Sequence, residues 1–328
     1  MAGKSRPGEF ALIERYFRPL ATDRGAFGLL DDAALYRQRP GDDLVLTADM
    51  LASGVHFFAD DPPESIARKS LRVNLSDLAG KGAEPFGYLL SLALPADWTE
   101  GWMKRFSAGL LADQKRYGVT LLGGDTIRAS GGVTISITAL GRIPKGEMVR
   151  RSGAKPGDAI FVSGTIGDAA LGLRIRQGSI EARKSEAKHL LDRLLHPQPR
   201  MALAPIVRRH ASAAMDVSDG LVGDLAHICD VSSVSAEIRA DLVPLSPAAR
   251  AILARAPDAL ATILGGGEDF EILATVSERS APAFAAAAKA ANVPVTRVGT
   301  IVKGKGPPAV RDGSGKIIAL TTAGHTHF

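Results

Sequence analysis

Carboxylates recur along the chain beside glycine or at the ends of apolar segments. They are Asp31, Asp32, Asp49, Asp77, Asp125, Asp216, Asp219, Glu268 and Asp269. A chain with a formal net charge of +5 does not need such a set for solubility. Carboxylate oxygens are ligands for hard cations, and Mg²⁺ is commonly held by one or two of them together with water and substrate phosphates. The pattern therefore predicts metal-bridged phosphate chemistry.

The composition restricts the possible partners. Basic residues are scattered and aromatic residues make up only 5% of the chain, which argues against nucleic acid because few side chains could stack on bases. The longest apolar stretch, residues 88–94, is far too short to cross a bilayer, and no apolar signal segment follows Met1. A single cysteine excludes an internal disulfide and favours a reducing compartment. We expect a cytoplasmic protein that acts on small anions and has no membrane or nucleic-acid partner.

The length and the order of the apolar segments predict the fold class. A chain of 328 residues is long enough for two domains of roughly 150 residues each. Strand-like and helix-like patterns alternate in both halves, which predicts an α/β or α+β fold. The pattern breaks after Pro144, and the turn residues 153–158 precede a new apolar strand. We therefore expect an N-terminal domain, 1–150, and a C-terminal domain, 151–328.

In the first half, local patterns position three of the polar residues. In a strand predicted over residues 44–49, alternation places Thr47 and Asp49 on the same face. A helix predicted over residues 64–79 carries Asp77 in its last turn, where the helix dipole disfavours a carboxylate unless a cation compensates. These placements favour a ligand role.

Glycines accompany the remaining carboxylates. A short strand is expected to end in a turn at residues 123–126, where the glycines before Asp125 allow the backbone to approach a ligand. In the second half, a strand leads into Asp216, and three glycines precede Glu268. Each motif alone is more typical of an ordinary turn, but together they could converge around divalent ions.

Several common catalytic motifs are absent from the sequence. It contains neither a G-x-x-x-x-G-K-[ST] phosphate loop nor an H-R-D catalytic loop. It also contains neither H-E-x-x-H nor G-x-S-x-G, which removes the simplest protease and esterase interpretations. ATP binding would therefore need a different architecture.

A series of segments, in the same order along the chain, resembles those of one enzyme family. The segments are residues 8–10, 31–34, 47–49, 54–57, 73–79, 123–126, 151–158, 216–221, 266–271 and 327–328. They are similar to those of the thiamine-monophosphate kinases, within the superfamily of aminoimidazole ribonucleotide synthetase and selenophosphate synthetase. The resemblance implies ATP-dependent conversion of thiamine monophosphate to thiamine diphosphate, with several Mg²⁺ ions bridging enzyme and phosphates. It also implies a homodimer, with an N-terminal domain of mixed sheet and helices that binds ATP and metal and forms the dimer contact, and a C-terminal α/β sandwich.

The resemblance also implies roles for individual residues. The metal ligands would be Asp32, Thr47, Asp49, Asp77, Asp125, Asp216 and Asp219, with Thr47 auxiliary and Asp219 holding a further ion. The residues that contact ATP would be Gly124, Asp125, Arg151 and Ser218, and those that face thiamine monophosphate would be His56 and Glu268. Among these, Asp49, Asp125 and Asp216 would be the catalytic centre.

The sequence departs from the family pattern at three places. Leu30 replaces the glycine that usually precedes the paired aspartates, and Ala48 replaces a common hydroxyl residue. The C-terminal residues 321–328 lack the aromatic side chain that the family usually places before Gly324 to contact the substrate. The substrate contacts are therefore the part of the resemblance that this sequence supports least.

Three residues have a structural rather than a functional interpretation. We expect Asp31 to shape the turn before Asp32, and Asp168, in its glycine turn, to cap a helix. Cys229 lies in a helical apolar pattern, which predicts core packing rather than a nucleophile.

Two alternatives remain at this point. Another member of the superfamily is one, although selenophosphate synthetase needs a reactive residue near the N-terminus and the single cysteine here is Cys229. Aminoimidazole ribonucleotide synthetase is less well matched by residues 74–79 and 266–271. The second alternative is a non-catalytic relative that binds ATP or a thiamine phosphate, against which the intact aspartates argue.

Overall fold

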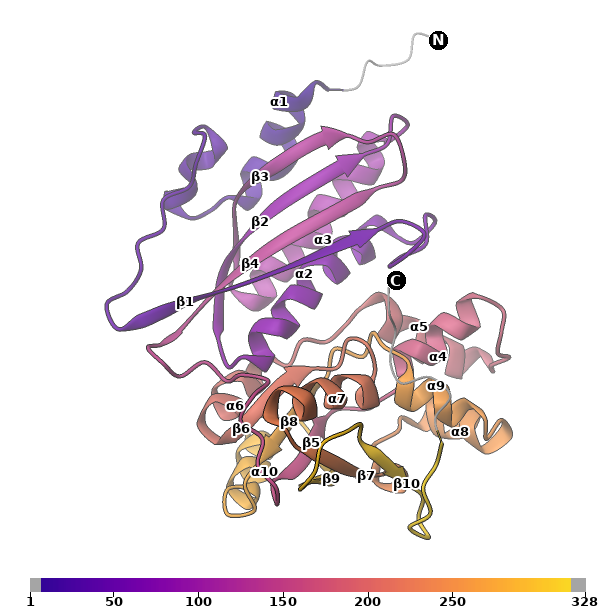
Figure 1. Ribbon diagram of the computed structural model, residues 1–328. Coiled ribbons are helices and arrows are strands. Elements are labelled where there is room, and N and C mark those ends of the chain that lie inside the picture. Colours follow the sequence, from indigo (N-terminus) through magenta and orange to yellow (C-terminus); the bar gives the residue numbers. More distant parts are fainter. Residues whose placement is uncertain (1–6, 320–328) are drawn as a thin grey trace. The chain divides into compact units, whose positions relative to one another are not determined.

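The computed structural model describes residues 7–319, which form two units (Figure 1). The first unit contains the chain up to Leu78 and then Glu84–Gly146, and the second contains Ala79–Ala83 and the chain from Glu147 onward. The sequence pattern predicts a single boundary after residue 150, whereas in the structure Ala79–Ala83 also belongs to the second unit. The roles expected of the two domains remain predictions. No helix among the described residues is long and apolar enough to span a membrane.

The first unit is a four-stranded sheet with helices on one face. Its strands are β1 (Asp42–Ala52), β2 (Glu84–Leu94), β3 (Thr120–Arg128) and β4 (Thr134–Pro144), and its α-helices are α1 (Glu9–Leu12), α2 (Pro63–Gly80) and α3 (Glu100–Tyr117). A π-helical turn (Ile13–Phe17) and two 3₁₀ helices (Arg18–Leu20 and Arg24–Leu29) follow α1. The strand order is β1-β4-β2-β3, with β2 and β3 parallel and the other pairs antiparallel. This is the mixed sheet that the sequence analysis predicts.

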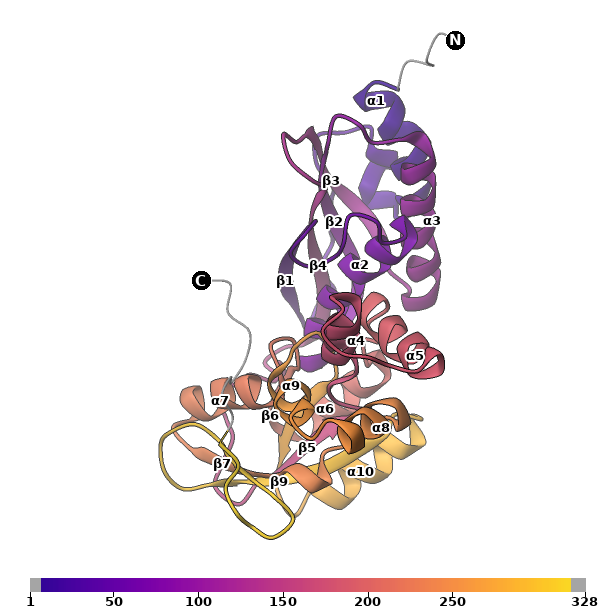
Figure 2. The same ribbon diagram turned by 90° about the vertical axis from the view of Figure 1, so that its right-hand side faces the viewer.

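One face of this sheet is covered by α2 and α3, as Figure 2 shows. Alternation along β4 buries Ile135 and Ile137 against these helices. The opposite face carries exposed apolar side chains, among them Leu46, Met50 and Ile127, whose exposed fractions are 59%, 62% and 57%. The first unit therefore has an apolar surface that nothing covers within the described residues of this chain.

The predicted turn at residues 123–126 is wrong, because β3 continues through it. Thr120–Arg128 pairs with β2 over its whole length, with a register irregularity between Tyr88 and Leu89. Gly124 allows this continuation: a Cβ at this position would lie 1.8 Å from the carbonyl oxygen of Leu90. The glycine thus marks a close approach of two strands rather than the end of one.

The second unit is a six-stranded sheet with helices on both faces. Its strands are β5 (Ala159–Ser163), β6 (Ala211–Asp216), β7 (Ser235–Arg239), β8 (Ile272–Val276), β9 (Val295–Val302) and β10 (Ala309–Arg311), in the order β10-β7-β9-β5-β8-β6. Its α-helices are α4 (Asp168–Arg176), α5 (Lys184–Leu195), α6 (Ala204–His210), α7 (Leu221–Ser232), α8 (Pro247–Arg255), α9 (Ala259–Gly265) and α10 (Ala281–Ala290), and two 3₁₀ turns are Met201–Leu203 and Ala240–Leu242.

Alternating side chains of the central strands divide the core of this unit in two. On β5, Ile160 and Val162 belong to one apolar cluster, which also contains residues of α4, α5, α7, α8 and α9. Phe161 belongs to the other cluster, with Val207 of α6 and Phe284 of α10. A strand covered on both faces is continuously apolar, which explains why the sequence of β5 shows no polar alternation. The two-layered covering agrees with the predicted α/β sandwich.

Candidate metal and phosphate site

In the first unit, β1 and α2 face each other through polar side chains. Thr47 and Asp49 lie on the helix-covered face of β1, as alternation predicts. The hydroxyl of Thr47 donates to Asp77 Oδ2 over 2.5 Å, and the N–H of Asp49 donates to Asn74 Oδ1 over 3.1 Å. Asn74 and Asp77 are three residues apart on α2 and therefore share one side of the helix. The structure thus brings together Thr47, Asp49 and Asp77, three of the predicted ligands.

The electrostatics of this cluster favour a cation. Burial raises the pKa of Asp49 to about 6, and the Asp77 carboxylate adds to this effect. Two carboxylates that repel each other in a partly buried place are more stable when a positive charge lies between them. A hydroxyl and two carboxylates are also the all-oxygen donor set that Mg²⁺ prefers. The residues therefore fit a divalent hard cation.

Asn74 is a member of this cluster that the sequence analysis missed. Its side chain is fully buried, its Nδ2 donates to the carbonyl of Ser70 over 3.0 Å, and its Oδ1 accepts from Asp49. With one bond at each end of the amide, Asn74 fixes the backbone of β1 beside the carboxylates. The spacing of three residues before Asp77 could have indicated it.

His56 lies in the loop after β1 with a defined tautomer. Its Nδ1 accepts the N–H of Ala52 over 3.1 Å, and its carbonyl accepts from Lys69 Nζ over 2.7 Å. Because Nδ1 is an acceptor, the proton of the neutral ring is on Nε2. This predicted substrate residue is therefore a donor through Nε2.

Asp125 does not join the carboxylates of β1 and α2 within one chain. β1 and β3 are opposite edges of the sheet, three strand spacings or roughly 14 Å apart. The register also aligns Asp125 with Ser91, Ser136 and Met50, which belong to the uncovered face, whereas Asp49 belongs to the covered face. An ion held by Asp49 and Asp77 is thus out of reach of Asp125 of the same chain.

The paired aspartates before β1 lie in an exposed turn. Asp31 Oδ1 accepts the N–H of Asp32 over 2.8 Å, which agrees with a turn-shaping role for Asp31. The 3₁₀ helix that precedes them contains Phe27, Gly28 and Leu29 with positive φ. Within the described residues this is a run of unusual backbone immediately before Leu30, the position at which the family usually has glycine.

In the second unit, two loops are joined by backbone hydrogen bonds. The N–H of Phe270 donates to the carbonyl of Val217, and the N–H of Glu268 donates to the carbonyl of Ser218, each over 2.8 Å. Glu268 and Phe270 have φ of +74° and +50°, values that cost free energy for residues other than glycine. The structure thus brings the loop after β6, with Ser218, beside the loop before β8, with Glu268.

Two further predicted residues adjoin the loop after β6, and a third lies beside the other end of α7. Asp216 is the buried last residue of β6, and Asp219 lies two residues beyond Val217 in the same loop. Arg151 is exposed and precedes a turn in which Ser232 Oγ accepts from the N–H of Gly153 and donates to the carbonyl of Arg151. Ser232, the last residue of α7, therefore anchors the turn that carries Arg151.

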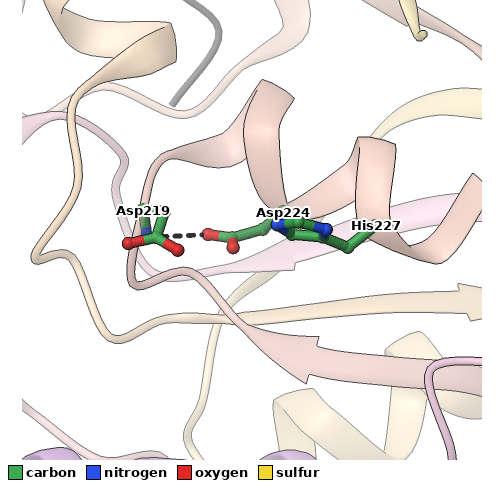
Figure 3. A group of neighbouring side chains, drawn as sticks. All are labelled: Asp219, Asp224 and His227. Atoms are coloured by element: carbon green, nitrogen blue, oxygen red, sulfur yellow. Dashed lines mark hydrogen bonds between the residues drawn. The ribbon is translucent and has the colours of Figure 1, made fainter. Parts of the chain in front are cut away.

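Asp224 is a second residue that the sequence analysis missed. It lies in the first turns of α7, is fully buried, and accepts backbone N–H groups from Ser218, Asp219 and Gly220. Burial raises the pKa of Asp224 to about 7, and the nearby Asp219 carboxylate also raises it, while the three N–H bonds oppose the shift. Asp219, Asp224 and His227 place one ligand atom each within 4.8 Å of one another (Figure 3).

Two buried carboxylates, Asp269 and Glu271, stabilise the loop before β8. Glu271 is fully buried and accepts from Arg193, Arg200 and Ser163. Asp269 Oδ2 accepts the N–H of Gly167 over 2.7 Å, and burial raises the pKa of Asp269 well above its usual range. Their hydrogen bonds to neighbouring segments fix the position of the loop before β8.

The expected helix cap at Asp168 is wrong. Gly167 is the N-cap of α4, and Asp168 is the first helical residue. Its carboxylate accepts instead from the hydroxyls of Thr165 and Ser246, over 2.7 and 2.5 Å. The hydroxyl of Ser246 comes from a segment 78 residues away, so the local sequence pattern around Asp168 could not reveal it. The expected packing of Cys229 is confirmed, since its side chain is 1% exposed.

Two family models match most of the chain. They are the N-terminal domain of AIR synthase related proteins over residues 30–143 and the C-terminal domain over residues 155–310. The two units thus have the fold of an AIR synthase related protein.

Individual relatives are more specific. The thiamine-monophosphate kinase of Caulobacter vibrioides is 43% identical over 311 residues, which are 94% of this chain and 88% of the relative. The crystal structure of thiamine-monophosphate kinase from Stenotrophomonas maltophilia K279a matches with a TM-score of 0.84 and 42% identity, over 95% of this chain and 98% of that one. The structure of AaThiL complexed with AMPPCP and TMP matches with a TM-score of 0.78 and 30% identity, over 93% and 97%. The chain belongs to the thiamine-monophosphate kinase family.

Proposed function

We propose that the protein catalyses ATP- and Mg²⁺-dependent phosphorylation of thiamine monophosphate to thiamine diphosphate. The identity of 43% with the Caulobacter vibrioides kinase, over 94% of this chain, carries the proposal. The similarity to AaThiL complexed with AMPPCP and TMP supports the same pair of substrates. The transfer is direct and in line, without a phosphoenzyme.

The chemistry needs positioning more than it needs a base. A phosphomonoester has its second pKa near ~6, so the attacking oxygen of thiamine monophosphate is already anionic at neutral pH. The difficulty is the approach of two anions. In the first unit, Mg²⁺ would be held by Asp32, Thr47, Asp49 and Asp77. In the second unit, it would be held by Asp216 and Asp219. When bound, Mg²⁺ screens the phosphate charges and orients the attacking and leaving oxygens.

Other residues would bind the organic parts and the phosphates. His56, as a donor through Nε2, suits a phosphate oxygen of thiamine monophosphate. Glu268 would complement the cationic thiazolium ring, and its positive φ is typical of a residue held in place for a ligand. Arg151 offers two parallel N–H groups to an ATP phosphate, and Ser218 offers its hydroxyl, because both its backbone groups are engaged. Gly124, on β3 beside Asp125, completes the proposed ATP contacts.

We also propose that the working form is a homodimer joined through the uncovered face of the first unit. The exposed apolar side chains of this face, Leu46, Met50 and Ile127, are those that a second copy would bury. The position of Asp125 on the same face supports this arrangement. Because β1 is an edge strand, we propose that Asp125 of one copy reaches the metal site of the other around that edge, which Asp125 of the same chain cannot do.

The proposal is tested by following thiamine diphosphate directly. Purified protein is incubated with ATP, Mg²⁺ and thiamine monophosphate, and the products are separated chromatographically, with an EDTA-treated sample as the control. We expect thiamine diphosphate and ADP in equal amounts, and neither in EDTA. Binding of Mg-ATP with no turnover of thiamine monophosphate would instead indicate a non-catalytic relative and reject the proposal.

A further inference from the structure

Asp224 binds three consecutive backbone N–H groups with one oxygen. Its Oδ2 accepts from Ser218 over 2.9 Å, from Asp219 over 3.0 Å and from Gly220 over 3.1 Å. Successive N–H groups that point to one place form a nest, which in many proteins binds a phosphate or another anion. Here the anion is a carboxylate of the protein itself. The loop after β6 is therefore closed on its own chain.

We infer that Asp224 is a positioning residue, which acts by holding the loop of residues 217–220 in the shape that presents Ser218 and Asp219 to Mg-ATP. This role rests on the proposed function, whereas the clamp on the backbone does not. Asp224 contacts neither nucleotide nor metal in this role. Its own second oxygen, Oδ1, is buried and has no hydrogen-bond partner among the described residues.

The clamp decides which groups of the loop can reach a ligand. The N–H of Ser218 points to Asp224 and its carbonyl accepts from Glu268, so the hydroxyl is what Ser218 can offer. The N–H of Asp219 is engaged in the same way, which leaves its carboxylate. Phosphate binding by backbone amides of this loop is thus replaced by binding through side chains and the cations they hold.

The rest of the loop leaves little freedom for another shape. A Cβ at Gly220, where φ is +121°, would lie 2.6 Å from the carbonyl oxygen of Gly265. A Cβ at Gly267 would lie 2.1 Å from the carbonyl oxygen of Ser218. The loop is thus packed against its neighbour on one side and held by Asp224 on the other. Removal of the Asp224 carboxylate therefore removes only the hydrogen bonds to the loop and leaves its packing against residues 265–267 in place.

The clamp is tested first by hydrogen exchange, without any substrate. In the wild type, the amides of residues 218–220 should exchange slowly, and fast exchange there would overturn the inference without any variant. In Asp224→Asn, which keeps an acceptor oxygen but not the charge, we expect exchange roughly tenfold faster at these amides, since a hydrogen bond to a charged acceptor is worth about 1–1.5 kcal/mol more than one to a neutral acceptor. Amides of β6 and β8 should not change. Asp230→Asn is the matched control, because Asp230 is an exposed aspartate on the same helix.

The effect on the reaction is tested by steady-state kinetics on the same proteins. In Asp224→Asn we expect kcat/KM for Mg-ATP to fall at least about tenfold, and KM for thiamine monophosphate to change less than KM for Mg-ATP. Asp230→Asn should match the wild type. Equal kinetic constants in Asp224→Asn and wild type, despite loosened amides, would overturn the positioning role. If the wild type itself gives no turnover, the proposed function fails, while the exchange result still decides the clamp.

Discussion

Asp49 is partly buried and lies beside a second carboxylate, and both properties destabilise its charged form when no cation is bound. Its pKa is raised to about 6 by burial and by the Asp77 carboxylate, whereas an unfolded chain would have the usual value near 3.8. A raised carboxyl pKa means that folding favours the protonated form. Metal-free protein therefore loses stability as the pH rises from about 4 to about 6, and the loss is complete above that range. The two carboxylates thus lower the free energy of unfolding of the metal-free protein, and the same repulsion favours binding of a cation.

This balance predicts opposite effects of one substitution on stability and activity. Asp49→Asn removes the charge with little change in shape, so in EDTA at pH 7 the variant should be more stable than the wild type by roughly 1–3 kcal/mol. Urea unfolding monitored by circular dichroism measures this difference. Activity in Mg²⁺ should fall about 100-fold or more. A variant that is both less stable in EDTA and fully active would contradict the assignment.

At the scale of the elements, most of the fold follows from sequence because its signals are local. The strand with Thr47 and Asp49 and the helix with Asp77 were predicted within a few residues of β1 and α2. The error at residues 123–126 has a physical reason: glycines indicate a turn locally, but in the sheet they allow β3 to approach β2. The roles of Asn74 and Asp224 depend on partners in other elements, so periodicity alone could not reveal them.

The two adjacent glycines of β3 make this interpretation testable. A Cβ at Gly124 would meet the Leu90 carbonyl oxygen at 1.8 Å, whereas a Cβ at Gly123 would meet only the Leu89 side chain at 3.4 Å. Gly124→Ala should therefore lower the free energy of unfolding by about 2 kcal/mol or more, and Gly123→Ala should change it by less than about 1 kcal/mol. Thermal and urea unfolding of the two variants would measure this. Equal effects would mean that the close approach of the strands is not what requires glycine.

At the scale of the whole molecule, the uncovered face of the first unit predicts the oligomeric state. Leu46→Glu places a charge in the proposed contact and should shift sedimentation from dimer to monomer. Val231→Glu is the control, because Val231 is equally apolar and exposed at 55% but lies on α7 in the second unit. A Leu46→Glu protein that remains dimeric would place the contact elsewhere.

A mixing experiment tests whether the site is shared between copies. Asp49→Asn and Asp125→Asn should each be inactive alone. After joint unfolding and refolding in equal amounts, half of the dimers contain one chain of each kind and one intact site, so about a quarter of wild-type activity should return. If Asp49 and Asp125 act within one chain, every site carries a substitution and no activity returns.

The single thiol, on helix α7, allows opening of this helix to be measured by chemical labelling. Cys229 lies five residues after Asp224, is 1% exposed, and burial raises its pKa to about 11. Alkylating reagents at neutral pH should thus leave the native protein unmodified and active, because the reactive thiolate is scarce and covered. Labelling occurs only when the helix opens, and its rate, followed by mass spectrometry, gives the frequency of that opening. A slow rate that ATP and Mg²⁺ slow further would show that nucleotide binding and the integrity of this helix are energetically coupled.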